Sequence, residues 1–158
     1  MPRMKATVAY DGTDFSGFQI QPNARTVQGE LEAVLKKMHK GKPVRVHASG
    51  RTDAGVHAIG QTIHFDTSLR IDADGWLRAF RAMLPDDILV HSIEQAPPDF
   101  HARYHAKKKE YRYRMQIGKY PDVFRRHVVY HLDSALDIEA MRKALPHCIG
   151  THDFTSFC

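Results

Sequence analysis

The pattern of apolar and polar residues in the N-terminal segment predicts a strand followed by a helix. Residues 5–10 alternate with a period of two, as a half-buried strand does. Thr26 is a candidate helix N-cap. The apolar side chains after it recur at helical spacing, at Val27, Leu31, Val34, Leu35 and Met38. The run Gly41-Lys42-Pro43 then ends the helix, whose apolar face we expect in the core.

A long connection joins this strand to this helix. It spans residues 11–25, here named the N-terminal loop, and loops of this length in compact domains are often functional. Phe15, Phe18, Gln19 and Gln21 within it could contact a nucleic acid through stacking and amide hydrogen bonds. They could equally pack the loop itself, and the sequence leaves both interpretations open.

Two further strands are predicted at residues 44–49 and 56–66, close enough in sequence to pair as a hairpin. Between them lies a turn bracketed by two glycines, residues 50–55, which we name the glycine turn. His57 and His64 fall on the second of these strands. We predict ordinary hydrogen-bonded histidines there rather than metal ligands, because no third ligand has suitable spacing.

The next segment completes a small domain. Asp72 or Asp74 can begin a second helix, and residues 87–93 predict a fourth strand. The order strand, helix, strand, strand, helix, strand is the ferredoxin-like pattern of an α+β domain. Its sheet carries helices on one face and leaves the other face free for a ligand. Pro97-Pro98 indicates a stiff boundary, so we predict a first domain at residues 1–98.

Residues 99–158 predict the start of a second, similar α+β domain. The alternation from residue 109 to residue 115 fits a strand, residues 127–132 predict another, and residues 138–145 predict an amphipathic helix. A second layer would need more strands than this segment supplies. We therefore expect a second domain that is truncated in this chain.

Composition narrows the class of protein. The chain has 158 residues, is 42% hydrophobic, and carries 23 Lys and Arg against 18 Asp and Glu, for a net charge of +5. This predicts a folded protein whose basic surplus suits a polyanionic partner. Cys148 and Cys158 make no disulfide framework and lack metal-site spacing, which favours a reducing, cytoplasmic setting. We expect neither a membrane span nor a signal peptide.

The segment from residue 103 to residue 114 interleaves cations with aromatic side chains. Its members are Arg103, Tyr104, His105, Lys107, Lys108, Lys109, Tyr111, Arg112, Tyr113 and Arg114. Cations neutralise phosphates and aromatic faces stack on bases, so the pattern favours a nucleic-acid contact. A half-buried strand with a solvated polar face would give the same alternation, and both can be true.

The glycine turn holds the strongest candidate chemistry. Arg51 and Asp53, two residues apart, would project from the same side of an extended backbone. An adjacent guanidinium holds a carboxylate ionised, which suits a nucleophile or a general base. The alternative is an ion pair that only pins the loop, and spacing alone favours that alternative.

Several ordered motifs are similar to those of the TruA family of tRNA pseudouridine synthases. Gly50 to His57 resembles the family's catalytic motif, and the residues from Tyr10 to Gln21 resemble its N-terminal signature. The other matching segments are Arg25 to Glu30, Phe100 to Arg103, Lys109 to Tyr113 and His152 to Phe157. Several motifs in order are much harder to meet by accident than one. Family members continue for roughly another half-length.

The resemblance implies a fold, an activity and a set of site residues. The fold would be that of the pseudouridine synthases, and the activity would be isomerisation of uridine to pseudouridine in the anticodon stem-loop of tRNA, without cofactor or metal. Asp53 would be the nucleophile, attacking either sugar or base, Arg51 would orient it, and Tyr111 would stack on the flipped base. Members form homodimers. The expected RNA-binding residues are Gln19, Arg25, Arg103, Lys107, Lys108, Lys109 and Arg112.

Two other functions remain open at this point. The chain could be a non-catalytic RNA-binding module, in which the basic surface binds without turnover. It could also be a metal-dependent RNA hydrolase using Asp53. A lone carboxylate beside an arginine argues against the hydrolase, because metal-dependent nucleases gather several acidic ligands.

Overall fold

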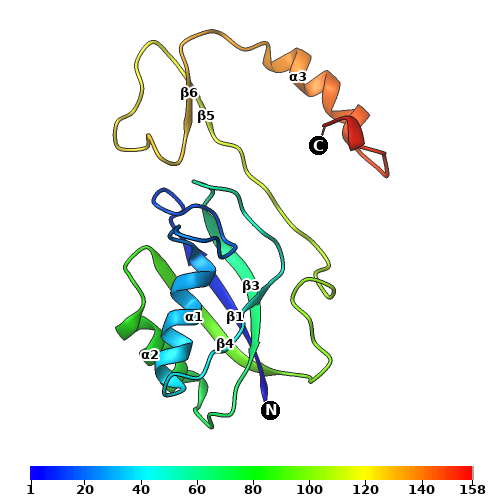
Figure 1. Ribbon diagram of the computed structural model, residues 1–158. Coiled ribbons are helices and arrows are strands. Elements are labelled where there is room, and N and C mark those ends of the chain that lie inside the picture. Colours follow the sequence, from blue (N-terminus) through cyan, green and yellow to red (C-terminus); the bar gives the residue numbers. More distant parts are fainter. Residues whose placement is uncertain (158) are drawn as a thin grey trace. The chain divides into compact units, whose positions relative to one another are not determined.

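The structure, a computed structural model, describes residues 1–157 and contains two compact units, Met1–Glu110 and Tyr111–Cys158 (Figure 1). Cys148 is a free, exposed thiol, whereas the predicted unpaired state of Cys158 lies outside the described residues. Over the described range, none of the helices combines the length and the apolar character needed to cross a membrane.

The first unit is built on a four-stranded antiparallel sheet. Its strands are β1 (Arg3–Tyr10), β2 (His47–Ala48), β3 (Ala58–Asp66) and β4 (Ile88–Ala96), in the spatial order β2-β3-β1-β4. Central β1 pairs with both β3 and β4, and Ala6 lies opposite Ile63 on one side and Ile93 on the other. With one helix after β1 and one after β3, this is the predicted ferredoxin-like arrangement, which is confirmed.

Helices α1 (Val27–Met38) and α2 (Ala73–Met83) cover one face of this sheet (Figure 1). Both N-caps fall where the sequence predicts them, since Thr26 Oγ1 accepts from Gly29 N at 3.3 Å and Asp72 Oδ1 accepts from Gly75 N at 2.7 Å. Alternate residues of β1 are buried against the helices, and the residues between them are only partly covered. The core includes Trp76, the single tryptophan of the chain, which packs its ring against Phe65 and Phe80.

The second strand is much shorter than predicted. Only His47 and Ala48 pair with β3, although residues 44–49 were expected to do so. The reason is that side chains of α1 form hydrogen bonds with the backbone of Val46, the residue directly before this strand. Val46 N donates to Glu32 Oε1 at 2.9 Å, and Gln28 Nε2 donates to Val46 O at 3.1 Å. Val46 is nevertheless buried, so its place in the core does not require a strand.

The first compact unit extends past the predicted domain boundary at residue 98. Ala102 is 2% exposed, and its N–H donates to His64 Nδ1 at 3.1 Å. Arg3 Nη1 donates to Phe100 O at 2.8 Å. These bonds hold the segment after β4 against the sheet, and the unit ends at Glu110. The division into domains at residues 1–98 and 99–158 stays a prediction.

The second unit holds two short strands and three short helical segments. Strands β5 (Met115–Ile117) and β6 (Tyr130–Leu132) pair in parallel, followed by α3 (Ile138–Ala144), η1 (Leu145–Cys148) and η2 (Thr155–Phe157). The prediction of a strand from residue 109 was wrong, because β5 begins only at Met115. In the described part of this unit β6 is the only partner for β5, and it pairs over three residues.

Candidate active site

The N-terminal loop packs against the glycine turn and holds it in place. Phe18 N donates to Thr52 O at 3.0 Å, and Gly55 N donates to Phe15 O at 3.2 Å. Tyr10, at the end of β1, adds a hydrogen bond of 2.8 Å between its hydroxyl and Thr52 Oγ1. The turn is therefore fixed through its backbone, and the Arg51 and Asp53 side chains on either side of Thr52 are left exposed.

Two glycines of the N-terminal loop permit this close contact. A Cβ built on Gly17 would lie 2.8 Å from Thr52 O, and Gly17 has a φ of +92°, in the left-handed region. A Cβ on Gly12 would lie 2.1 Å from Val56 O. Any larger residue at either position would collide with the backbone of the turn or of the residue directly after it. These glycines are thus part of how the site is built.

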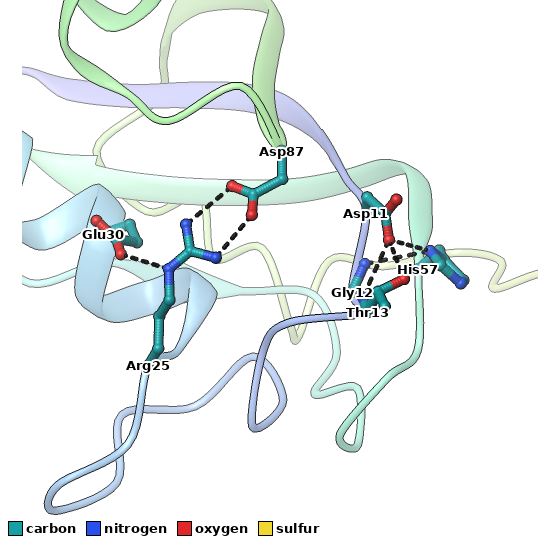
Figure 2. A network of polar contacts seen from close by, with 7 residues as sticks. All are labelled: Asp11, Gly12, Thr13, Arg25, Glu30, His57 and Asp87. Atoms are coloured by element: carbon teal, nitrogen blue, oxygen red, sulfur yellow. Dashed lines mark hydrogen bonds and ion pairs between the residues drawn. The ribbon is translucent and has the colours of Figure 1, made fainter. Parts of the chain in front are cut away.

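A polar network secures the start of the N-terminal loop (Figure 2). Asp11 Oδ1 accepts from Thr13 N at 3.0 Å and from Thr13 Oγ1 at 2.6 Å. His57 is the second residue after the glycine turn, and its Nδ1 lies 3.0 Å from the same oxygen and 3.2 Å from Gly12 N. His57 is hydrogen-bonded, as predicted, and it ties the loop to the beginning of the β3 segment.

Arg25 secures the other end of the loop (Figure 2). Its guanidinium donates to both carboxylate oxygens of Asp87, at 2.7 and 3.0 Å, and to Glu30 Oε1 at 3.0 Å. It also lies over the ring of Phe15, 4.1 Å from the centroid. The hydrogen bond to Asp87, more than any other contact, raises the pKa of Arg25. The hydrogen bonds of Arg25 thus serve the structure of the loop, and its expected contact with RNA stays a prediction.

Arg51 and Asp53 line a pocket of about 430 Å³ between the N-terminal loop and the glycine turn. We name it the Asp53 pocket, and its other polar side chains include Gln19 and Gln21. Over residues 1–157, no hydrogen bond or ion pair joins the Arg51 and Asp53 side chains. The carboxylate is consequently exposed to whatever enters the pocket, and the guanidinium is available to the same ligand.

A second pocket, of about 470 Å³, lies beside the first and shares Gln19 and Arg51 with it. We name it the cationic pocket after the basic side chains that line it, which are Arg45, His47, Arg51, His101, Arg103 and Lys109. The described residues that line it include no Asp or Glu. Both pockets lie wholly within the first unit.

The predicted site residues fall into several groups. Gln19 and Arg51 line both pockets, Asp53 lines the first, and Arg103 and Lys109 line the second. Lys107 and Lys108 are exposed and line neither pocket. Tyr111 and Arg112 belong to the second unit, so the roles expected of them stay predictions.

Sequence reasoning missed the contribution of Arg45, His47 and His101 to the cationic pocket. A signal for two of them was available. Arg45 and His47 stand two apart just before the glycine turn, so an extended backbone projects both from one side. His101 offered no such signal, because its approach to this surface depends on the folding back of the segment after β4.

Three histidines of the first unit form a compact cluster. Ring nitrogens of His47, His64 and His101 lie within 4.8 Å of one another, close enough to be considered as metal ligands. However, His64 Nδ1 accepts from Ala102 N, and His101 Nδ1 accepts from Arg103 N at 3.2 Å. A neutral ring that accepts on Nδ1 carries its proton on Nε2, which then cannot ligate. Metal binding would therefore require a tautomer change that breaks these bonds.

His64 is held in its neutral form. Burial, with smaller contributions from His47, His101 and Arg3, lowers its pKa to about 4. Burial also lowers the pKa of His101. The hydrogen bond that His64 accepts agrees with the prediction that it is an ordinary hydrogen-bonded histidine.

Comparison with known proteins finds relatives that are tRNA pseudouridine synthases. A family model described as tRNA pseudouridine synthase matches residues 6–105. Curated relatives named tRNA pseudouridine synthase A include one from Geobacillus sp., 61% identical over 99% of this chain and 63% of the relative. Another, from Halalkalibacterium halodurans, is 60% identical over 100% of this chain and 60% of the relative.

A third relative, tRNA pseudouridine synthase A 1 from Bacillus cereus, is 58% identical over 100% of this chain and 64% of the relative. The chain thus spans less than two thirds of the length of these relatives. The matched residues contain both pockets except for Lys109, together with the loop and the turn that form them. The chain belongs to the tRNA pseudouridine synthase family.

Proposed function

We propose that the protein containing this chain isomerises uridine to pseudouridine in the anticodon stem-loop of tRNA. The observation that carries the proposal is the Asp53 pocket, in which an exposed carboxylate and an exposed guanidinium are presented on a rigidly held turn. Family membership supports the reaction, and the names of the relatives support tRNA as the substrate.

The reaction changes the atom of uracil that is bonded to the ribose and leaves the atomic composition of the nucleotide unchanged. The bond between uracil N1 and ribose C1′ breaks, and a bond from C5 to C1′ forms. C5 loses its proton and N1 gains one, so no oxidant, reductant or co-reactant is needed. Asp53 is proposed as the nucleophile that stabilises the detached intermediate, by attack on either the sugar or the base.

Access to this bond requires that the nucleotide leave its helix. The glycosidic bond is shielded in a stacked stem, so the uridine must be extruded into the pocket. Arg51 and Gln19 line this pocket. We propose that Arg51 holds the extruded nucleotide through charge-assisted hydrogen bonds and that Gln19 offers its amide group to the base. Tyr111 is proposed to supply a stacking surface. We further propose a cytoplasmic homodimer as the working form.

The experiment is Asp53→Asn in the full-length protein, assayed on an unmodified tRNA transcript with direct detection of pseudouridine. The two side chains are nearly the same size, so folding and RNA binding should persist, whereas turnover should fall by at least about 10³-fold if the carboxylate is the nucleophile. Asp74→Asn, on the exposed surface of α2, is the matched control and should retain activity. Substantial turnover by Asp53→Asn would remove Asp53 from this role.

A second candidate is that this chain alone binds RNA without turnover. The cationic pocket favours it, because the whole of that pocket lies within the first unit. The 158-residue chain and the full-length protein should then bind the transcript comparably, while only the latter forms pseudouridine. Turnover by the short chain would reject this candidate.

A further inference from the structure

Tyr10 lies at the end of β1, beside the glycine turn, and has no part in the reaction as proposed. We propose that Tyr10 is a positioning residue, which holds Asp53 in place for attack through the hydrogen bond of 2.8 Å between the Tyr10 hydroxyl and Thr52 Oγ1. This inference rests on the proposed function, because it concerns how the same site presents its nucleophile. Thr52 transmits the effect, since it stands directly before Asp53.

The first argument is that the backbone of the glycine turn decides where the Asp53 carboxylate lies. The Asp53 side chain is exposed. Among residues 1–157, no other side chain forms a hydrogen bond or an ion pair with it. Its direction is therefore set by the backbone that carries it, and any movement of that backbone moves the carboxylate within the Asp53 pocket.

The second argument is the position of Thr52 within the turn. The Thr52 carbonyl belongs to the planar peptide unit that also contains the nitrogen and Cα of Asp53. Its oxygen accepts from Phe18 N at 3.0 Å, which orients that plane. The hydroxyl of the same residue is bonded to Tyr10, so Thr52 is held through both its backbone and its side chain. Loss of the hydroxyl bond would let Thr52 tilt about the remaining contact, and Asp53 would move with it.

The third argument is the rigidity of Tyr10 itself. It is 4% exposed, and it is aligned with Ala58 of β3 on one side and with Ile88 of β4 on the other. Its ring packs beside that of Phe18, with centroids 6.2 Å apart, and Phe18 is also buried. Both bonds to Thr52 thus come from neighbouring residues of the core. A site supported by rigid elements is positioned more precisely than one supported by loops alone.

The fourth argument separates positioning from packing. Phenylalanine would fill the same space in the core, so packing alone does not require the hydroxyl of Tyr10. A buried hydroxyl is costly unless it is hydrogen-bonded, and the bond that this one makes leads to the residue between Arg51 and Asp53. Reacting groups must be held closely, since a displacement of about 1 Å can lower a rate by about 10²-fold. The hydroxyl is therefore placed where a small movement would matter most.

The test is a double-mutant cycle in the full-length protein, assayed for pseudouridine formation on an unmodified tRNA transcript. Tyr10→Phe and Thr52→Val each remove one side of the hydrogen bond and nearly keep the size of the side chain. Each should lower kcat by about 10- to 100-fold, with KM changed by less than about twofold. The double variant should lose no more than either single variant, because the bond is already absent. Thr52→Ser, which keeps the hydroxyl, should retain most of the activity.

The matched control is Thr67→Val, which makes the same substitution at a buried hydrogen bond outside the site. Thr67 is 1% exposed, and its Oγ1 lies 2.8 Å from His39 Nε2. Thermal unfolding should show a loss of stability in this variant, whereas its kcat at a temperature where it is folded should equal that of the wild type. An equal loss of kcat in Thr67→Val would assign the effect of Tyr10→Phe to general destabilisation and overturn the proposal.

Three further results would also overturn the positioning role. They are losses that multiply in the double variant, an impairment of Thr52→Ser as large as that of Thr52→Val, and a rise in KM with kcat unchanged. The proposed function is tested separately by Asp53→Asn. Full activity in Tyr10→Phe beside an inactive Asp53→Asn would reject the positioning role alone, whereas substantial turnover by Asp53→Asn would reject the nucleophile on which that role depends.

Discussion

At the scale of single residues, the site depends on two glycines as much as on charged side chains. Gly12 and Gly17 let the N-terminal loop approach the glycine turn and the residue after it closely enough to hydrogen-bond. The sequence indicated Arg51 and Asp53 through a short motif, whereas the role of these glycines depends on a contact between segments far apart in the chain. Such a contact leaves no local pattern.

Gly17→Ala tests this contact, with Gly41→Ala as its control. Both positions have left-handed backbone, with φ of +92° and +90°, so the strained φ alone should cost both variants about 1–2 kcal/mol of stability. Only at Gly17 does the new methyl group meet Thr52 O, whereas nothing lies within 4 Å at Gly41. We expect Gly17→Ala alone to abolish turnover in the full-length protein, measured beside thermal unfolding. Equal activity in the two variants would show that the contact is dispensable.

His64 makes stability depend on pH in a defined window. Its pKa is about 4 in the folded chain against 6.5 for an unperturbed histidine, so the unfolded state takes up a proton more readily. Above pH 6.5, His64 leaves the free energy of unfolding unchanged. As the pH falls towards 4, it lowers that free energy by up to about 3 kcal/mol. Asp66, whose pKa is lowered by the hydrogen bond from Arg3, loses its stabilising contribution only below that window.

His64→Gln should flatten this dependence, since an amide oxygen can still accept from Ala102 N without titrating. Urea unfolding between pH 4 and pH 7 measures the effect. His91→Gln, at an exposed position of β4, should keep the wild-type profile. An unchanged profile in His64→Gln would assign the acid sensitivity to other groups.

At the scale of elements, the observed helices agree with the predictions from sequence more closely than the observed strands do. Helix starts are fixed by local bonds, such as the caps at Thr26 and Asp72. A strand needs a partner, and the apolar pattern does not say whether one is present. Residues 44–46 and 109–114 alternate as strands do, but the first segment bonds to α1 and the second lies before the start of β5.

Glu32→Ala tests the replacement of strand pairing by helix side chains. Glu32 Oε1 accepts from Val46 N at 2.9 Å, and its loss leaves that donor without a partner in a buried segment. The expected cost is about 1–3 kcal/mol in the free energy of unfolding. Glu94→Ala removes an exposed ion pair with Lys5 and should cost less than about 1 kcal/mol. Similar costs for the two would mean that Glu32 is only a surface charge.

At the scale of the whole molecule, the buried apolar side chains described in the chain all belong to the first unit. The sequence predicted two domains of one kind from similar apolar patterns. Periodicity alone could not reveal that the second unit buries none of its α3 side chains, since burial depends on which elements are available to pack against.

This difference predicts how fragments behave. Residues 1–110 should unfold cooperatively on heating, because they contain the whole core. Residues 111–158 alone should show no cooperative transition by circular dichroism. A cooperative transition in the second fragment would contradict the assignment of all stabilising burial to the first.

The position of Trp76 gives the protein a built-in optical reporter. It is the only tryptophan of the chain, its ring is 0% exposed, and within residues 1–157 its Nε1 has no hydrogen-bond partner. An indole in such apolar surroundings emits at shorter wavelength than one in water. Fluorescence excited at a wavelength that tryptophan absorbs and tyrosine does not therefore follows the first unit alone, and a red shift on denaturation reports the loss of that core.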